Sequence, residues 1–262
     1  MKKIFSLFFI SVFIIIFSSC TADVDDTSQF KLVKKIIEVN KDETSLTINF
    51  AYDGDKIVSI DSELSNTTFT YSGNLITKII QLDKTSQDQK TFDYFYTNDN
   101  LTKVISSDNY TLNYTYQSGG KIAYEKTSTD SNINIVLVCN GTLSIQYNNV
   151  VQKNKTLNTS GVNILEKEEL SFAYDNKSNP LRNIVGFNKL LDHSELISAN
   201  NYYTNIVISS TKYLDSEAEV SSAVVISKNY NYDKEGYPKE VISTKPVFGK
   251  EDKNHLKTLY FY

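Results

Sequence analysis

Four adjacent residues, Asp192, His193, Ser194 and Glu195, gather the groups that hydrolytic enzymes use: an imidazole, a hydroxyl and two carboxylates. Such groups could support acid–base or nucleophilic cleavage of a glycan or a peptide. The members of a Ser-His-Asp triad, however, come together from distant positions of a chain, and no Gly-x-Ser-x-Gly turn occurs in this sequence. We therefore expect these four residues to form a solvated loop. An envelope hydrolase acting on glycan or peptide remains an alternative function.

The cysteines, histidines and acidic residues form no recognisable metal or cofactor pattern. The chain has 2 Cys and 2 His, which argues against a zinc site, a haem site or a disulfide framework. Asp53 and Asp55 flank a glycine, but the further oxygen ligands of a calcium loop are missing. Cys139 ends a β-branched run that is typical of a strand, so we expect a small buried side chain there. The sequence indicates no catalytic residue, no metal and no cofactor.

Cys20 carries the clearest chemistry of the chain. Lys2 and Lys3 precede an apolar run over residues 4–17, which is typical of a secretory signal and too short for a membrane span. The run ends in Phe-Ser-Ser-Cys, and here the chain resembles bacterial lipoproteins, with Phe and Ser in place of the commoner leucine and glycine or alanine. The resemblance implies that diacylglycerol is attached to the Cys20 thiol and that residues 1–19 are removed as a signal peptide. An acylated N-terminal cysteine anchors a protein stably without a spanning segment.

Residues 20–29 follow as a lipidated tether. Asp23, Asp25 and Asp26, with neighbouring Ser and Thr, are typical of a flexible and solvated linker. In some Gram-negative lineages, acidic residues after the lipid-bearing cysteine also resemble a tag for export to the cell surface. Both interpretations stay open. The expected location is therefore the outer membrane, by a lipid anchor at Cys20, with either periplasmic or cell-surface exposure.

The composition beyond the tether is that of a folded domain without a nucleic-acid partner. The chain has 262 residues, a formal charge of −4 and 40% hydrophobic residues, which is enough to build a core. Arg182 is the only arginine, and an acidic balance disfavours binding to phosphate backbones. No further apolar run of membrane length and no Pro-rich or Gly-rich linker interrupts the chain. Residues 30–262 are therefore expected to form a single β domain.

One unit recurs between residues 50 and 242: an aromatic residue, any residue, Tyr, a polar turn, and an apolar pair usually three residues apart. The aromatic-x-Tyr part puts two rings on one face of a strand, and the turn residues tolerate the backbone of a tight hairpin. A spacing of three would put the apolar pair on opposite faces of a straight strand. We therefore expect either that its first member caps the turn or that a β-bulge lies between the two. The tyrosines of the six copies are expected to be structural core residues: Tyr52, Tyr71, Tyr96, Tyr116, Tyr174 and Tyr232.

This unit resembles the tyrosine–aspartate (YD) repeats of Rhs-type proteins. Together with its N-terminus, the chain is similar to small bacterial lipoproteins built from divergent YD-like units, a group without an established biochemical function. The copies are far too few to wind the closed shell in which Rhs proteins hold a toxin, and no toxin segment follows them. The resemblance therefore does not carry the shell-and-toxin function over to this chain.

The pattern predicts an all-β fold, an antiparallel meander of repeated hairpins that forms a curved sheet or an open roll. One segment differs from the rest. Pro180 is placed where a helix can start, and the apolar residues at 181, 184, 185, 187, 190 and 191 have helical spacing. We therefore predict a short helical insert near residues 180–192, packed on one face or end of the sheet.

These features together favour a non-enzymatic outer-membrane lipoprotein whose sheet offers a binding or scaffolding surface. Its partners would be the membrane, through the N-terminal lipid, and a glycan or protein ligand. Tyrosines outside the repeat suit such a ligand, namely Tyr202, Tyr203 and Tyr213. Besides the hydrolase, a second alternative is a periplasmic chaperone for apolar cargo, which requires an open barrel with an apolar lumen.

Overall fold

A computed structural model gives the structure of residues 30–129, 134–158, 163–215, 218–243 and 255–262. Within these ranges the chain forms 17 strands and no α-helix. The strands are β1 (Lys35–Asn40), β2 (Ser45–Asp53), β3 (Lys56–Ser62), β4 (Ser65–Ser72), β5 (Leu75–Asp83), β6 (Gln89–Thr97), β7 (Asn100–Ser106), β8 (Tyr110–Tyr116), β9 (Lys121–Thr129), β10 (Ile135–Gln146), β11 (Asn149–Leu157), β12 (Ile164–Ser178), β13 (Asn200–Tyr213), β14 (Glu219–Ser227), β15 (Asn229–Tyr232), β16 (Pro238–Ile242) and β17 (His255–Phe261). Three short 3-10 turns accompany them: η1 (Ser118–Gly120), η2 (Phe187–Lys189) and η3 (Leu191–His193).

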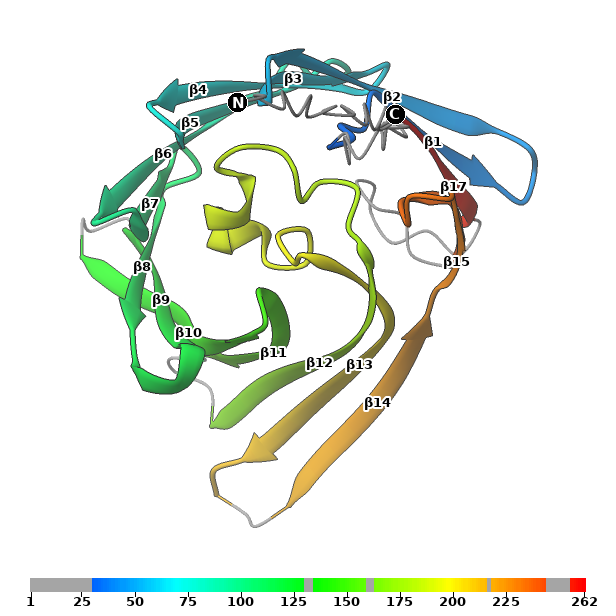
Figure 1. Ribbon diagram of the computed structural model, residues 1–262. Helices are drawn as coiled ribbons and strands as arrows, with labels where there is room; N and C mark the ends of the chain where they lie inside the picture. Colours follow the sequence, from blue (N-terminus) through cyan, green and yellow to red (C-terminus); the bar gives the residue numbers. More distant parts are fainter. Residues whose placement is uncertain (1–29, 130–133, 159–162, 216–217, 244–254) are drawn as a thin grey trace, which may run out of the picture.

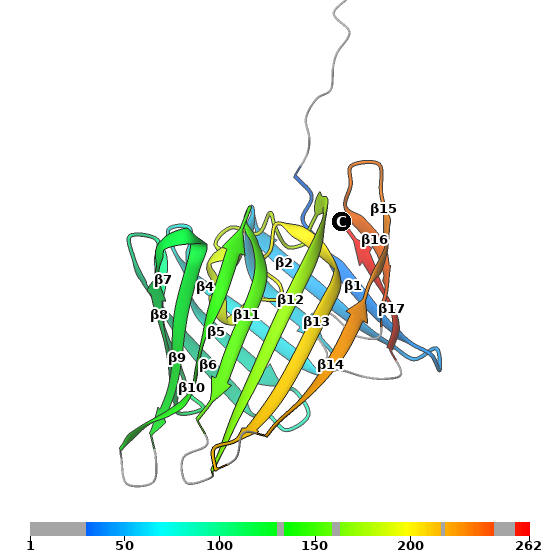
Figure 2. The same ribbon diagram turned by 90° about the horizontal axis from the view of Figure 1, so that it is seen from below.

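The strands form one antiparallel meander. Each pairs with the next along the chain from β1 to β14 and from β15 to β17. Only Lys228 separates β14, which pairs with β13, from β15, which pairs with β16. The first strand also pairs with the last, from Lys35 opposite Phe261 to Asn40 opposite His255. The sheet therefore curls into a nearly closed barrel, as Figure 1 and Figure 2 show. The all-β meander is confirmed, and the barrel is more closed than the predicted open roll.

The wall of the barrel has an apolar inner face and a polar outer face. In β2 the side chains alternate between exposed and covered along the whole strand, as a period of two requires. Ile48 and Phe50 are buried in the core, while Thr47, Asn49 and Asp53 are exposed. The same inner face continues in the other strands of the first half, where isoleucine, leucine and valine residues form a single core cluster.

The repeated units are hairpins with a bulge, as the three-residue spacing predicts. In the first three copies the ladder shifts directly after the first apolar residue, which is Ile57, Ile76 or Leu101. The bulge adds one residue to the returning strand, so both members of the apolar pair point inward. The turn between β6 and β7 has two residues with positive φ, Asn98 and Asp99, as a type I′ hairpin requires.

The repeat tyrosines connect neighbouring hairpins through their hydroxyl groups. The Tyr96 hydroxyl donates to the carbonyl oxygen of Ile76 at 2.8 Å, and the backbone N–H of Ile57 donates to the Tyr71 hydroxyl at 3.2 Å. Both backbone groups belong to the bulge of the preceding hairpin. A bulge disrupts the ladder locally and frees backbone groups that need another partner. This explains why the unit carries tyrosine at this position, since phenylalanine has no hydroxyl to offer.

The other repeat tyrosines have related partners. The Tyr174 hydroxyl donates to the carbonyl oxygen of Val150 at 2.7 Å, directly after the turn between β10 and β11. Tyr52 donates to the carbonyl oxygen of Val33 at 2.7 Å. Tyr116 is 40% exposed and has a backbone hydrogen bond to Leu101, and Tyr232 donates to the carboxylate of Asp175.

The tyrosine network makes the stability of the barrel sensitive to alkaline pH. Burial raises the pKa of Tyr71 and that of Tyr174 to about 12. A folded-state pKa above the unfolded value of about 10 means that this stabilisation is complete below pH ~10 and is lost as the pH rises through about 12. We expect the midpoint of urea unfolding to be constant from pH ~7 to 9 and to fall between pH ~10 and 12. In Tyr71→Phe the midpoint should fall less steeply, because up to one proton fewer is released on unfolding. An identical slope would contradict the assignment of this pH dependence to Tyr71.

Residues 179–199, which we call the plug, leave the wall between β12 and β13 and run inside the barrel (Figure 1). The base of the plug is closed by a hydrogen bond of 3.0 Å from the N–H of Asn179 to the carbonyl oxygen of Ala199. Its tip is held against the wall, because the Tyr71 hydroxyl donates to the carbonyl oxygen of Val185 at 3.0 Å. Six apolar side chains of the plug are buried, and the first four of them recur at a spacing of three: Leu181, Ile184, Phe187, Leu190, Leu191 and Ile197.

The predicted helical insert is wrong in its geometry. The N–H groups at 184, 187, 190, 193 and 196 each donate to the carbonyl oxygen three residues earlier, at 2.8–3.2 Å. A run of three-residue turns, including η2 and η3, therefore replaces an α-helix. Gly186 interrupts the segment with a φ of 73°, and a Cβ there would lie 2.6 Å from the carbonyl oxygen of Asn74. The apolar spacing satisfies the three-residue repeat as well as the helical one.

Candidate functional site

Several spaces lie between the plug and the wall, and two of them share residues of the plug. One, the polar chamber, has a volume of about 280 Å³ and lies toward β13, β15 and β17. The other, the apolar chamber, has a volume of about 660 Å³ and lies toward β2–β5. His193 and Leu196 line both, so the C-terminal part of the plug separates the two spaces. Ligand pockets of proteins have volumes of ~300–1,000 Å³, so both chambers are near or within that range.

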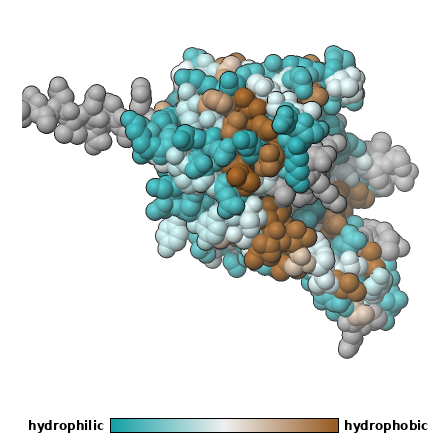
Figure 3. Space-filling view, turned by 90° about the vertical axis from the view of Figure 1, so that its right-hand side faces the viewer, coloured by the Kyte–Doolittle hydropathy of each residue, from teal (hydrophilic) through white to brown (hydrophobic). Residues whose placement is uncertain are grey.

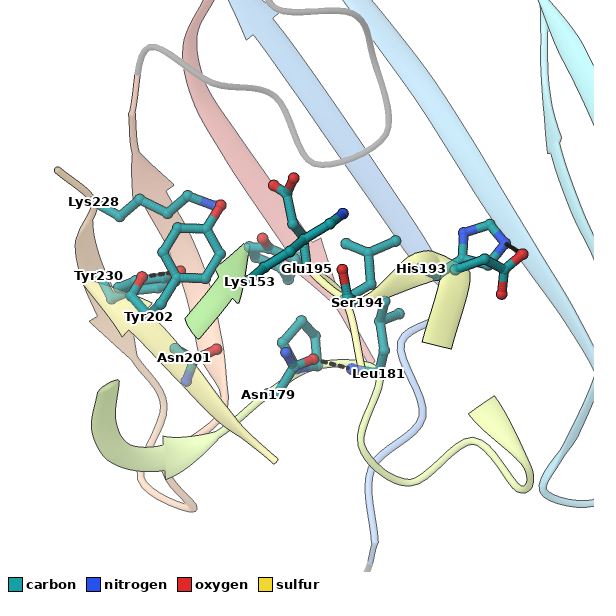
Figure 4. Close-up of a pocket in the computed structure, with 14 residues that line it drawn as sticks. Lys153, Asn179, Leu181, His193, Ser194, Glu195, Asn201, Tyr202, Lys228 and Tyr230 are labelled. Atoms are coloured by element: carbon teal, nitrogen blue, oxygen red, sulfur yellow. Dashed lines mark hydrogen bonds and ion pairs between the residues drawn. The ribbon is translucent and has the colours of Figure 1, made fainter. Parts of the chain in front are cut away.

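The polar chamber contains the residues that the sequence offers for catalysis. Asp192, His193, Ser194 and Glu195 line it from the plug, as Figure 4 shows for the last three. The expectation of a solvated loop is wrong, because apolar neighbours such as Leu191 draw the segment into the barrel.

Their arrangement is not that of a hydrolytic triad. The Nε2 atom of His193 lies 3.6 Å from the Oδ2 atom of Asp192, which is too long for a hydrogen bond. That oxygen instead accepts the Tyr94 hydroxyl at 2.8 Å. Burial, together with the nearby Asp192 charge, raises the pKa of Tyr94 far above its ordinary value. In Figure 4 the His193 ring lies away from Ser194 and Glu195. The His193 imidazole is therefore not placed to activate the Ser194 hydroxyl.

The opposite side of the polar chamber is aromatic and basic. The Lys228 ammonium lies 3.9 Å from the centre of the Tyr202 ring, and the Tyr230 hydroxyl donates to the Tyr202 carbonyl oxygen at 3.2 Å. Burial raises the pKa of Tyr202 above its ordinary range. Of the three tyrosines proposed for a ligand surface, Tyr202 thus lines a chamber. Tyr203 and Tyr213 are both 47% exposed, and neither lines the chamber.

Two polar groups beside this chamber are buried without a hydrogen-bond partner among the described residues. They are the Ser194 hydroxyl and the Oδ1 atom of Asp192. An unpartnered buried polar group is costly, so these atoms are places where water or a small polar molecule would be stabilised. The chamber can therefore hold a polar ligand, although no reacting pair is assembled in it.

The apolar chamber is a cup between the wall and the plug. Its sides are formed by inward-facing residues of β2–β5, among them Leu46, Ile60 and Phe69. Its floor is formed by the plug residues Phe187 and Leu190. Around its rim are polar side chains from the ends of β3 and β5, the starts of β4 and β6, and the loop that follows β5: Ser62, Ser65, Asp83, Ser86, Asp88 and Lys90.

The residues proposed for lipidation and export lie outside the described ranges. These are Cys20, the signal peptide 1–19 and the tether 20–29 with its three aspartates. Cys139 is described and is a free, buried thiol on β10. In the described part of the chain, no helix is long and apolar enough to cross a membrane. The same part holds no group of three or more potential metal ligands.

The fold and the two chambers define a plugged antiparallel β-barrel with interior spaces of ligand size. No family model and no curated protein matches the chain. Among solved structures, a porin-like protein from Bacteroides vulgatus ATCC 8482 is similar, with a TM-score of 0.55 and 14% identity over 89% of this chain and 99% of that one. A porin-like protein from Bacteroides uniformis ATCC 8492 matches with a TM-score of 0.31 and 10% identity over 87% and 95%. The first likeness shows a shared barrel fold.

Sequence reasoning missed most of the chamber residues. Lys153 lies on β11 and Lys228 lies between β14 and β15, both without any motif, and they meet Tyr230 only because the barrel closes. Tyr230 belongs to the sixth repeat copy, whose other ring, Tyr232, was the one expected in the core. The sequence did carry a signal for the apolar chamber, because the inward-facing positions of β2–β5 are apolar over more residues than the plug can cover.

Proposed function

We propose that this chain is a non-enzymatic lipoprotein of the outer membrane, held by acyl chains on Cys20, whose barrel stands in water and binds ligands in its lumen. The observation that carries the proposal is the polarity of the wall, which is apolar inside and polar outside. A barrel with this polarity needs a separate anchor, and the lipoprotein-like N-terminus supplies one.

The outer face of the wall is too polar to face the hydrocarbon core of a membrane. Membrane-spanning barrels present an apolar band ~25 Å tall around their whole outer surface and keep polar residues inside. Here the exposed positions of β2 are Ser45, Thr47, Asn49, Ala51 and Asp53. The outward positions of β4 are likewise hydroxyl-bearing, as at Thr68, Thr70 and Ser72. Burying such groups in lipid without partners would cost several kcal/mol in total.

Exposed apolar residues occur on several strands, and on the side that Figure 3 shows they are interrupted by polar residues. Figure 3 shows one side of the molecule, where hydrophobic patches are surrounded by hydrophilic residues. Val220, Val224 and Val225 of β14 are 56–65% exposed, and Ile242 and Phe261 are more than 40% exposed. Patches of this kind on one side of a barrel fit contacts with a partner better than a continuous lipid belt.

The N-terminal end of the described chain sets the orientation of an anchored barrel. Lys31 forms ion pairs with Asp233 and Glu235 at 2.6 and 2.8 Å, in the turn between β15 and β16. Asn183 of the plug donates to the carbonyl oxygen of Lys31 at 3.0 Å. The chain therefore reaches the barrel at the end where the plug is tied to the wall. An anchor at Cys20 would attach at this end and leave the opposite rim facing away from the membrane.

The likeness to porin-like proteins supports an envelope location for such a barrel. It supports the architecture and not a pore, because residues of the plug occupy the lumen and belong to the same buried cluster as the wall. The hydrolase alternative has no comparable support, since the polar chamber pairs no nucleophile with a base.

Removing the lipid acceptor tests the proposal. We expect Cys20→Ser, directed to the periplasm by a cleavable signal that needs no lipidation, to be recovered folded in the soluble fraction, while the wild-type chain stays with the outer membrane. The measurement is fractionation without detergent, with strand content followed by circular dichroism. Cys139→Ser is the matched control and should stay in the membrane, because Cys139 is a buried residue of β10. Retention of Cys20→Ser in membranes as a folded barrel would overturn the proposal.

A further inference from the structure

We infer that the apolar chamber is a binding site for a single-chain amphiphile with an uncharged, hydrogen-bonding head group, such as a monoacylglycerol. The inference rests on the proposed function in one respect, that the barrel stands in water and binds in its lumen. It does not depend on the anchor and can be tested on the Cys20→Ser chain.

The inner face of the barrel is covered by the plug at one end only. Near the plug, Ile57, Ile76 and Leu101 are fully buried. Beside the chamber, Leu46 and Phe69 face inward in the same way but are only partly buried. Both pack against the core cluster on one side, and the rest of their surface lines the chamber. A ligand that removed this apolar surface from water would gain affinity roughly in proportion to the area it covers.

The shape of the chamber favours an apolar chain that inserts with its tail first. Phe187, Leu190 and Leu196 of the plug close the inner end. The polar residues stand at the other end, where β3 and β5 finish, so the chamber is apolar at its floor and polar at its rim. Its volume of about 660 Å³ lies within the range of ~300–1,000 Å³ that encloses a small organic ligand.

The charges at the rim disfavour an anionic head group. Lys90 is the lysine of the chamber lining, and it already pairs with Asp108 at 2.7 Å. The Asp83 carboxylate accepts the N–H groups of Thr85 and Ser86 at 2.8 and 3.0 Å. With Asp88 also at the rim, an anionic head group would meet two carboxylates and a lysine that is already paired.

Hydroxyl groups complete the rim and suit a hydroxylated head. Ser62, Ser65 and Ser86 line this end of the chamber, and each hydroxyl can donate one hydrogen bond and accept others. Gln81 and Thr67, which are paired across β5 and β4, add an amide and a further hydroxyl below the rim. A glycerol head group could exchange hydrogen bonds with these side chains without a charge of its own.

Three probes with one chain and different heads test the inference: monolauroylglycerol, laurate and lauroylcholine. Each is titrated by calorimetry, below its micelle concentration, into the Cys20→Ser chain recovered as a folded soluble protein. We expect one monolauroylglycerol per chain, a negative heat-capacity change from apolar burial, and at least tenfold weaker binding of laurate. Tighter binding of laurate or of lauroylcholine would overturn the uncharged head group. No binding of any probe to the folded chain would overturn the site, while leaving the anchoring proposal intact.

A pair of adjacent residues on β4 gives a matched control. Thr67 lines the chamber, and its neighbour Thr68 is exposed on the outer face of the wall. Thr67→Trp should fill the chamber and weaken monolauroylglycerol binding at least tenfold, whereas Thr68→Trp should bind like the parent. If Thr67→Trp does not fold, Gln81→Trp blocks the same space from β5. Unchanged affinity in a folded chamber variant would overturn the inference.

Discussion

Gly141→Ala is expected to destabilise the barrel by about 3 kcal/mol, at the upper end of what overpacking costs. Gly141 lies in β10 between Tyr124 of β9 and Lys155 of β11. A Cβ at this position would overlap the carbonyl oxygen of Asn154 and lie 2.6 Å from the Tyr124 hydroxyl oxygen. Asn154 is paired with Thr142 of β10 and with Glu169 of β12, so its backbone can move only if pairing in the sheet is disturbed. The ring cannot move freely either, because its hydroxyl donates to that same oxygen at 3.0 Å.

Urea unfolding followed by circular dichroism measures this effect. Asn140→Ala is the matched control, since Asn140 is the exposed neighbour on the same strand and surface substitutions usually change stability by less than ~0.5 kcal/mol. Gly141→Ala should also lower the melting temperature without changing the ligand selectivity of the apolar chamber, which lies among β2–β5. If Gly141→Ala lowered the free energy of unfolding by less than about 1 kcal/mol, the contact of the Tyr124 ring with Gly141 would not limit the residue that β10 can hold there.

The hairpins could be predicted because their determinants are local. Aromatic-x-Tyr, a polar turn and an apolar pair lie within about a dozen residues, and each element acts on its neighbours. Even the bulge follows from the spacing of Leu101 and Val104, which must both reach the core. Tyr147 and Asn148 also form a hairpin turn, because both residues adopt positive φ between β10 and β11.

The plug and the closure could not be predicted, because they depend on contacts between distant residues. The fifth copy, which contains Tyr174, reads like the others until Asn179, yet the chain then turns into the lumen. Pro180 and the apolar spacing mark the segment that begins with Leu181 and Ile184 as different, but nothing local indicates that it packs inside a barrel. The pairing of β1 with β17 likewise joins the two ends of the described chain. The candidate site is made by these same long-range contacts, so only single members of it, such as Tyr202, could be found from sequence.

Leu190→Ala is expected to destabilise the barrel by about 3 kcal/mol, because removal of a fully buried leucine side chain costs ~2–5 kcal/mol. Leu190 has no exposed surface and belongs to the core cluster that joins plug and wall. It occupies the middle of the run of three-residue turns, where its N–H donates to the carbonyl oxygen of Phe187 at 3.1 Å. The matched control is Leu214→Ala, since that leucine is 58% exposed. The free energy of unfolding of this variant should differ from that of the parent by less than ~0.5 kcal/mol.

The same substitution separates two views of the plug. If the plug is part of the core, the loss appears in the single cooperative unfolding of the whole barrel, because wall residues such as Ile76 and Leu101 lose their cover. If the plug is an independent lid, the wall unfolds at the parent's urea concentration while the plug alone loosens. Hydrogen exchange at Ile184 and Leu190 against exchange in β5 distinguishes the two. We expect the exchange rates of plug and wall to rise together, since the plug's buried side chains and its hydrogen bond from Tyr71 tie it to the wall.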